Sequence, residues 1–220
     1  LLQHPEWMKQ VLGELDRVYG SGRPIDFESL RELERTEWVV KEALRLHPPL
    51  FILIRAALQD TTVLGYKIPK GTWVALSPSV AHRIDTVFEN SGGFCPHRYG
   101  APRFEDRQPF AYISFGGGRH KCMGNAFALL QIKTIVAHLL RGFEFELHGD
   151  PVEADFQGLV IGPKMPIRVR YRRIERASTS AEAHSADSTA EATASEPDAR
   201  LRPFRVVVDH DLCQGHGVCE

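Results

Sequence analysis

One cysteine stands where glycines, basic residues and an apolar helix meet. Residues 115–124 read FGGGRHKCMG, and Cys122 directly precedes a long apolar run that ends near Leu140. Glycine lets the backbone approach a bound group closely, and the free amides of a helix N-terminus stabilise a thiolate. Such a thiolate can ligate haem iron, and the three basic residues before it would meet haem propionates. An inert, buried cysteine is the alternative, and for an isolated cysteine it is the commoner case.

A carboxylate and a guanidinium are spaced to form an ion pair further upstream. Glu42 and Arg45 lie about one turn apart on a predicted helix, so their side chains can meet on one face. On a solvated surface such a pair contributes only a few tenths of a kcal/mol. The spacing alone therefore leaves open whether this pair lies on the surface or in the core.

Helices and short strands must position these residues. Apolar spacing and capping residues predict helices over residues 5–19, 27–33, 36–46 and 123–140, the last one buried because it is apolar nearly all round. Alternating or β-branched runs predict strands within residues 49–58, 61–76, 142–147 and 165–173, with turns at Gly65 and Gly71. We therefore predict a mainly α fold with small β-sheets, in the α+β class.

The composition is that of an ordinary globular chain. It has 220 residues, 43% of them hydrophobic and 25% charged, and a formal net charge of -1, which gives no support for nucleic-acid binding. Four cysteines are too few and too scattered for a disulfide framework, which favours a reducing compartment. No apolar run has the length of a membrane span, and no signal peptide is visible. Because the chain opens without methionine and stops directly after Cys219, we interpret it as a fragment.

Composition also divides the chain into three parts. Residues 1–174 contain the predicted helices and strands. Residues 175–203 are rich in Ala, Ser, Thr and Glu, and they cannot bury enough apolar surface to offset their ordering entropy, so we predict a flexible linker. An Ala-rich helix is the alternative, which the Ser/Thr content and Pro197 oppose. Residues 204–220 resume with alternating strand character and begin a second domain.

The residues around Cys122 resemble the signature of the cytochrome P450 haem-thiolate monooxygenases. The match to F-x-x-G-x-[RH]-x-C-x-G involves Phe115, Gly118, His120, Cys122 and Gly124. Several defined positions within ten residues rarely coincide by chance, so the signal is specific. The resemblance implies that residues 1–174 form the C-terminal part of the P450 fold. It also implies that Cys122 is the axial ligand of haem b and that the other four residues shape the haem-binding loop.

Two further motifs of the same family follow in the expected order. Residues 42–45, EALR, resemble its E-x-x-R helix, and residues 94–99, FCPHRY, resemble its F-x-P-x-R-[FY] segment. The resemblance implies a buried, structural triad of Glu42, Arg45 and Arg98 that locks the core against the cysteine loop.

Within the family, the chain is most similar to the sterol 14α-demethylases, notably over residues 110–135. This resemblance implies that Arg55 and His120 bind haem propionates. It also implies an apolar substrate cavity lined by two segments: Leu50, Phe51, Ile52, Leu53, Ile54, Leu159, Val160 and Ile161. A simple buried strand is the alternative for the first segment. GGG in place of the commoner GAG, and Asn125 after the signature, depart from the subfamily pattern.

The C-terminal residues resemble the opening of a small bacterial-type ferredoxin. Cys213 and Cys219 flank His216 in a glycine-containing loop, and thiolates on such loops hold iron–sulfur clusters. Together with one thiolate beyond residue 220, the two cysteines would hold a three-iron cluster, which we favour over a four-iron cluster with His216 as an added ligand. A zinc site or an unligated cysteine pair is the alternative.

The resemblances together imply a monooxygenase with its electron donor fused to it. The expected partners are a hydrophobic small molecule, with a sterol favoured, molecular oxygen, and a ferredoxin reductase that passes on electrons from NAD(P)H. By this resemblance the oxygen-activating helix of the family would lie upstream of Leu1, so the fragment alone is not expected to be competent. A monooxygenase for another hydrophobic substrate and a non-catalytic haem or redox-sensing module remain open. We expect a bacterial cytoplasmic location, with membrane association through an upstream segment left open.

Overall fold

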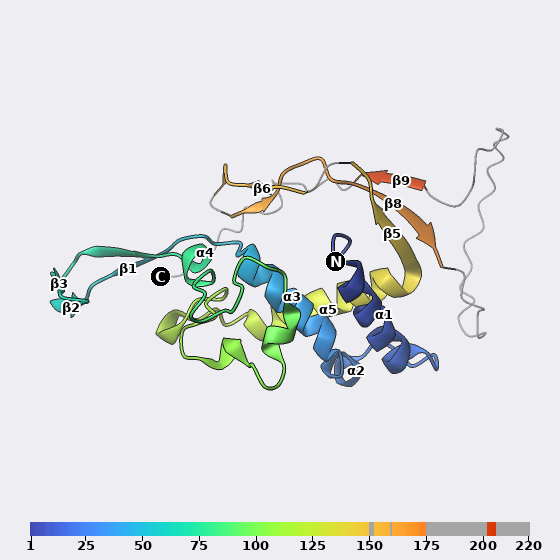
Figure 1. Ribbon diagram of the computed structural model, residues 1–220, viewed down its shortest axis with the longest axis horizontal. Helices are drawn as coiled ribbons and strands as arrows, with labels where there is room; N and C mark the ends of the chain where they lie inside the picture. The colour runs from blue at the N-terminus through green and yellow to red at the C-terminus, as the bar shows by residue number, and fades with distance from the viewer. Residues whose placement is uncertain (150–151, 159, 175–201, 206–220) are drawn as a thin grey trace.

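The computed structural model describes residues 1–149, 152–158, 160–174 and 202–205. Figure 1 shows a group of helices that includes α1, α3 and α5, a long hairpin that projects to one side, and a small sheet that passes over α1. All of the strand pairings are antiparallel. The described residues therefore form helices with small sheets at their side, which confirms the predicted α+β class.

Helix α1 (Pro5–Tyr19) has the boundaries that the sequence predicts. It begins at a proline, which suits the first helical position, and it is followed by Gly20. Its buried apolar residues recur every three or four positions: Trp7, Val11, Leu15 and Val18. This spacing gives the helix one apolar face, which packs on α3 and α5.

Helix α2 (Phe27–Arg31) begins with a reciprocal capping box. The backbone amide of Ser29 donates to Asp26 Oδ1 at 2.7 Å, and the amide of Asp26 donates to Ser29 Oγ at 2.9 Å. Two amides that the helix itself leaves free are thereby satisfied. The predicted cap at Asp26 is confirmed.

Helix α3 (Glu34–Leu46) receives its cap from another helix. Its own N-cap residue makes no side-chain hydrogen bond. Instead, the buried Glu14 carboxylate of α1 accepts hydrogen bonds from the amides of Arg35, at 2.7 Å, and Thr36, at 2.9 Å. The negative charge of Glu14 also lies where the α3 macrodipole is positive. Helix α1 thus fixes the position at which α3 begins.

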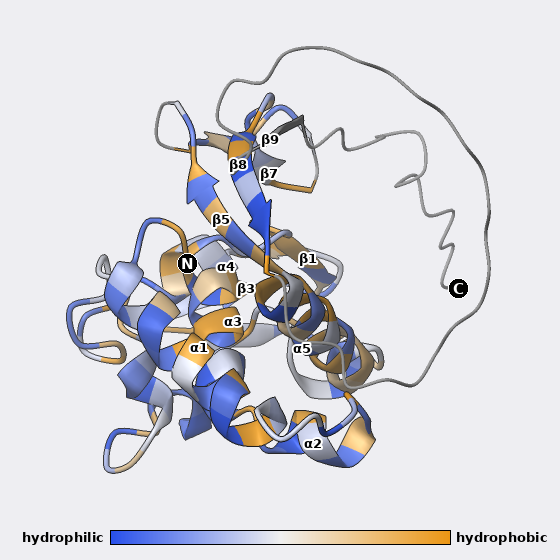
Figure 2. Cartoon of the chain, turned by 90° about the vertical axis from the view of Figure 1, so that its right-hand side faces the viewer, coloured by the Kyte–Doolittle hydropathy of each residue, from blue (hydrophilic) through white to orange (hydrophobic). Residues whose placement is uncertain are grey.

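Helix α5 (Asn125–Gly142) follows the cysteine loop, as predicted, but it is not buried all round. Lys133, Ala137 and Leu140 are buried, and Lys133 Nζ lies 3.0 Å from Glu37 Oε2 of α3. Phe127 and Ile135 remain 68% and 50% exposed, although Figure 2 shows hydrophobic residues along much of this helix. The expectation of a fully buried helix is wrong for the described residues, because α1, α2 and α3 cover one side only.

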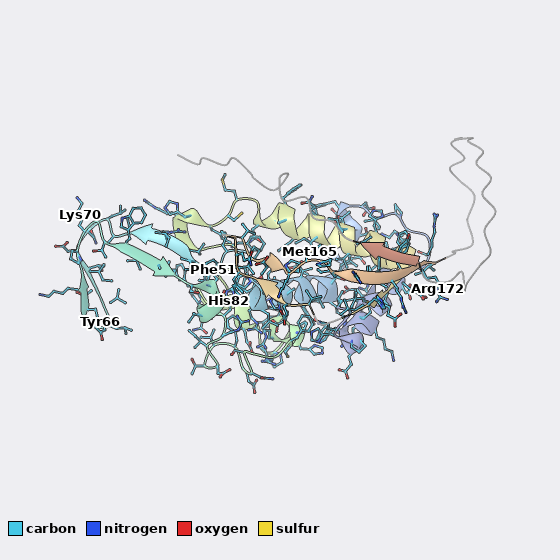
Figure 3. The ribbon with its side chains drawn as sticks, turned by 90° about the horizontal axis from the view of Figure 1, so that it is seen from above. Phe51, Tyr66, Lys70, His82, Met165 and Arg172 are labelled. Atoms are coloured by element: carbon cyan, nitrogen blue, oxygen red, sulfur yellow. The ribbon has the colours of Figure 1, made fainter. Side chains whose placement is uncertain are left out.

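The region after α3 forms an extended double hairpin. Strand β1 (Leu53–Ala56) pairs with β4 (Trp73–Leu76), and between them β2 (Thr61–Val63) pairs with β3 (Tyr66–Ile68). Gly65 and Gly71, the two predicted turn residues, have positive φ values of 86° and 83°. Figure 3 shows Tyr66 and Lys70 at this far end and Arg172 at the opposite end of the molecule, with His82 and Phe51 between them.

Short helices and loops connect the hairpin to α5. They comprise α4 (Pro78–Ala81) and the 3-10 helices η1 (Pro96–Tyr99), η2 (Glu105–Arg107) and η3 (Gly118–His120). Helix η1 packs against α3, which places the FCPHRY segment beside the helix that carries Glu42 and Arg45. Segments that are distant in sequence thereby meet around α3.

The C-terminal strands form two small sheets. Strand β5 (Phe143–Leu147) pairs with β8 (Arg168–Arg173), and β6 (Ala154–Asp155) pairs with β7 (Gly162–Pro163). Strand β9 (Arg202–Arg205) pairs with the other edge of β8, so it spans the predicted boundary between linker and second domain. The rest of the predicted linker, and all three candidate cluster ligands, Cys213, His216 and Cys219, lie outside the described residues. Within the described part of the chain, no helix is both long and apolar enough to cross a membrane.

Candidate functional site

The cysteine loop is a tight turn that leads directly into α5. Gly116 and Gly118 adopt positive φ values of 72° and 64°, which glycine accepts without strain. The amide of Cys122 donates to the carbonyl of Phe115 at 2.8 Å and closes the loop. The Cys122 side chain is exposed, and α5 begins three residues later at Asn125. The loop therefore presents a thiol at a helix N-terminus, as predicted.

The Glu42, Arg45 and Arg98 side chains form a fully buried cluster. Arg45 binds Glu42 through two hydrogen bonds, from Nε to Oε2 at 2.8 Å and from Nη2 to Oε1 at 2.9 Å. Arg98 Nε donates to Glu42 Oε1 at 3.1 Å, and all three side chains have no exposed surface. Arg45 also donates to three backbone carbonyls, those of His82, Ser91 and Gly93. The cluster thus joins α3 to the loops that follow α4, and the surface alternative is excluded.

Sequence reasoning missed several members of this cluster. Tyr99 Oη donates to Glu42 Oε2 at 2.9 Å, and the amide of Cys95 donates to Oε1 at 2.8 Å. Glu105 binds Arg98 Nη1 at 2.5 Å and also pairs with Arg103. Tyr99 is the last residue of the FCPHRY segment, so the motif itself could have indicated that Tyr99 joins the cluster. No pattern in the sequence connects Glu105 to the cluster.

The cluster is arranged to remain ionised. Burial works against the charge of Glu42, but the hydrogen bonds from Arg45 and from the Cys95 amide outweigh it and hold the pKa of this carboxyl below its usual value. Burial likewise opposes the charge of Arg98, yet Glu105 and Glu42 raise the pKa of its guanidinium. Burial and the adjacent Glu42 charge raise the pKa of Tyr99, which stays a hydrogen-bond donor. Opposite charges with satisfied hydrogen bonds serve to fix geometry rather than to exchange protons.

His82 is a second buried titratable residue beside the cluster. It directly follows α4, and it has no exposed surface. Burial lowers the pKa of His82 to about 4, so the imidazole is neutral at physiological pH. Nothing in the sequence analysis singled out this histidine, because a lone histidine after a short helix carries no motif.

The pKa of His82 predicts a pH dependence of stability. The unfolded chain protonates this histidine near pH 6.5 but the folded chain only near pH 4, so the free energy of unfolding should fall as the pH drops through this window. The loss that is due to His82 should be on the order of 3 kcal/mol. Denaturant unfolding of wild type and His82→Gln between pH 7 and pH 4 measures it, because the variant lacks this titration. His138→Gln, which changes an exposed histidine of α5, is the control for the substitution itself. Parallel curves for wild type and His82→Gln would contradict the assignment.

The described residues around Cys122 fit a thiolate-ligated haem. The thiol is exposed, and a Cβ atom at Gly124 would lie in ordinary van der Waals contact with Cys122 Sγ, at 3.7 Å. Met123 and Phe127, one and five residues after Cys122, add exposed apolar surface, which suits a large planar macrocycle. His120 lies on the same loop and is exposed, as a propionate ligand must be. Thiol, apolar surface and a polar donor thus occur together.

Arg55, the other predicted propionate ligand, comes from a different element. It lies on β1, where its Nη1 donates to the carbonyl of Ile54 at 2.7 Å. Among the described residues, no hydrogen bond or ion pair joins Arg55 to the cysteine loop. Its assignment to a propionate therefore stays a prediction, as do the roles of Phe115, Gly118 and Gly124.

The two predicted substrate-lining segments lie side by side. Leu50 forms an isolated antiparallel bridge with Val160, and the amide of Ile161 donates to the carbonyl of Pro49 at 2.7 Å. Ile52 and Ile54 are 37% and 47% exposed, so this segment is not a simple buried strand. Leu159 lies outside the described residues. The structure brings together residues about a hundred positions apart, which the sequence alone could not establish.

Comparison with known proteins identifies the family. The family model described as cytochrome P450 matches residues 1–169, which include the cysteine loop and the Glu42 cluster. The chain belongs to the cytochrome P450 family. Membership in this family implies haem with a cysteine thiolate ligand, and Cys122 is the cysteine at the P450 signature position.

Individual relatives and solved structures agree with the P450 assignment. The chain is 44% identical over 176 residues to the sterol 14alpha-demethylase of Mycolicibacterium vanbaalenii, covering 79% of this chain and 39% of that protein. It is 47% identical over 181 residues to the obtusifoliol 14-alpha demethylase of Sorghum bicolor, covering 79% and 37%. The crystal structure of the haem domain of cytochrome P450DA superposes with a TM-score of 0.74 and 29% identity, covering 80% of this chain and 38% of that chain. The chain thus spans about two fifths of the length of these relatives.

Proposed function

We propose that this P450 chain is part of a haem-thiolate monooxygenase that removes the 14α-methyl group of a sterol. One observation carries the proposal: the exposed thiol of Cys122 lies on a closed glycine loop at the N-terminus of α5. The high identity to two sterol-demethylating enzymes supports the substrate class. When bound, the haem would supply the oxidising chemistry.

The residues of this chain would bind and orient the haem rather than react. Cys122 would provide the axial thiolate, and the α5 N-terminus would stabilise its negative charge. His120 and Arg55 would bind the propionates. The Glu42 cluster would keep the loops around α3 at a constant position, since its members are buried and fully hydrogen-bonded. None of these roles requires Glu42, Arg45 or Arg98 to touch the substrate.

The substrate proposal rests on the apolar segments that meet at Leu50 and Val160. Both side chains are exposed, at 39% and 57%, on surface that an apolar polycyclic ligand could cover. Ile161 is tied to the same place by its backbone hydrogen bond to Pro49. An apolar lining favours an apolar ligand such as a sterol over a small polar substrate.

Sterol binding to the haem-loaded protein should be visible by spectroscopy. Titration with a lanosterol-type sterol should shift the Soret band. Val160→Asp should weaken this binding by roughly tenfold or more, because it places a charge on the apolar lining. Val63→Asp, which changes a similarly exposed valine on the distant β2, should bind like wild type. A shift with a short fatty acid and none with sterols would instead favour the monooxygenase of another hydrophobic substrate.

We also propose that the C-terminal residues begin a ferredoxin that donates electrons within the same chain. The support comes from the sequence, in which Cys213, His216 and Cys219 follow a linker rich in Ala, Ser and Thr. Exposed Arg119 and Lys121 on the cysteine loop would attract an acidic donor. A ferredoxin reductase would in turn supply electrons from NAD(P)H.

Comparing the fused protein with its separated domains tests the donor role. A flexible linker of about 25 residues spans roughly 25–30 Å and raises the effective donor concentration towards the mM range. Turnover by the fusion should therefore exceed that of the separated domains at equal low concentration. Equal rates would show that the tether is incidental. A C-terminal domain without iron would remove the donor role, and redox cycling without turnover would favour the sensing module.

A further inference from the structure

The segment just before the cysteine loop is tied to α3 at three consecutive residues. Tyr112 Oη and Ser114 Oγ donate directly to backbone carbonyls of α3, at 3.2 and 3.0 Å. Between them, the backbone amide of Ile113 donates to Nε2 of His82 at 2.9 Å. Two of the three residues are thus hydrogen-bonded to α3 directly. The third, Ile113, is connected to α3 through the side chain of His82, which lies near the middle of the molecule (Figure 3).

The other ring nitrogen of His82 completes this connection. His82 Nδ1 lies 3.1 Å from the carbonyl oxygen of Arg45, and Arg45 Nη1 donates back to the carbonyl of His82 at 2.7 Å. Because Nε2 accepts from Ile113, the ring proton must reside on Nδ1, which then donates to Arg45. Only this neutral tautomer satisfies both contacts. Protonation would remove the acceptor for Ile113 and place a second cation beside the Arg45 guanidinium.

Packing holds the ring in this orientation. The imidazole stacks on Tyr112 with ring centroids 5.4 Å apart and an angle of 13° between planes, and it meets Phe88 edge-on at 6.0 Å. His82 and Phe88 have no exposed surface. A ring that is confined on both sides cannot turn away, so the position of Ile113 follows that of α3.

From Ile113 the connection continues to the thiol-bearing residue. The carbonyl of Ile113 accepts from the amide of Gly116 at 2.9 Å, and the carbonyl of Phe115 accepts from the amide of Cys122 at 2.8 Å. The Arg45 end of the path belongs to the buried ionic cluster, and the other end is the loop that would carry the axial ligand. We infer that His82 is a positioning residue, whose neutral imidazole joins the Arg45 carbonyl to the Ile113 amide and thereby sets the position of Cys122. This inference rests on the proposed haem-thiolate role of Cys122.

Two substitutions of His82 separate the two hydrogen bonds. An asparagine amide can take the place of Nδ1 and keep the contact with Arg45, but it is too short to reach Ile113. A glutamine amide extends to the place of Nε2 and can accept from Ile113. His82→Asn should therefore release Ile113, whereas His82→Gln should keep Ile113 hydrogen-bonded to residue 82, whose backbone carbonyl still accepts from Arg45 Nη1. His138→Asn, at an exposed position of α5, is the control for the substitution itself.

Two measurements on the haem-loaded full chain read the outcome. Hydrogen exchange at the Ile113 amide should become faster by about tenfold in His82→Asn and stay near the wild-type rate in His82→Gln and His138→Asn. In the reduced carbon-monoxide complex, His82→Asn should convert part of the thiolate-type Soret band to the band without thiolate ligation. Wild-type exchange at Ile113 in His82→Asn would overturn the inference. Fast exchange together with a fully retained thiolate band would also overturn it, since the hydrogen bond would then be purely local.

A measurement on the wild type covers the case in which His82→Asn does not fold. Nitrogen-15 NMR should show His82 with a protonated Nδ1 and an unprotonated, hydrogen-bonded Nε2. The opposite tautomer would overturn the inference without any variant. Failure of the proposed function looks different: a wild-type protein without any thiolate-type band would refute the role of Cys122, whatever the exchange rate at Ile113.

Discussion

Replacing Cys122 with serine should abolish the thiolate-type Soret band of the reduced carbon-monoxide complex. The expected effect is a complete loss, because a serine hydroxyl is not a thiolate and cannot ligate iron in the same way. The loop itself should persist, since its closing hydrogen bond from Cys122 to Phe115 uses the backbone amide. Absorption spectra of the purified, haem-reconstituted variant provide the measurement.

Cys95 offers a matched control for that experiment. It is the other cysteine among the described residues, it is only partly exposed, and its Sγ accepts from Arg103 Nη1 at 3.5 Å. Cys95→Ser should keep the thiolate-type band, because its contribution to the Glu42 cluster comes from its backbone amide. An unchanged band in Cys122→Ser, or its loss in Cys95→Ser, would show that the axial ligand is assigned wrongly.

Replacing Glu42 with alanine should prevent the protein from holding haem. The substitution leaves Arg45 and Arg98 buried without their shared carboxylate, and it removes the acceptor for Tyr99 as well. Loss of one member of a buried charge cluster typically costs about 3–5 kcal/mol. Denaturant unfolding should show a loss of this size, and the haem content after purification should fall with it.

An exposed ion pair provides the comparison for Glu42. Glu144 on β5 pairs with Arg172 on β8, and the two side chains are 55% and 46% exposed. Glu144→Ala should change the free energy of unfolding by less than about 1 kcal/mol, because solvent screens such pairs. Full haem content and normal stability in Glu42→Ala would contradict the structural role of Glu42.

The sequence was sufficient to predict those helix boundaries, caps and turns that depend only on neighbouring residues. The apolar spacing of Trp7, Val11 and Leu15 predicted α1 together with its end at Gly20. The cap at Asp26 and the turn glycines of the hairpin followed from rules that involve four residues or fewer. The glycine loop before α5 was predicted for the same reason, since both its φ values and its helix start are local properties.

Contacts between distant segments could not be obtained in this way. Glu14 caps a helix that begins twenty residues later, and its sequence neighbourhood is that of an ordinary charged residue on a helix. His82 and Glu105 join the buried cluster only because loops fold back on α3. The exposure of Phe127 and Ile135 depends on what packs against α5, which periodicity cannot determine.

The cap that Glu14 provides has a consequence for the order in which the chain assembles during synthesis. A ribosome releases the chain from its N-terminus, so α1, with its carboxylate, emerges before the first turn of α3 exists. The Glu14 carboxylate, which accepts from the amides of Arg35 and Thr36, is therefore synthesised before those amides. Arg98 and the cysteine loop emerge later than the residues of α1 and α3. Vectorial synthesis thus builds the support before the loop that would receive the haem.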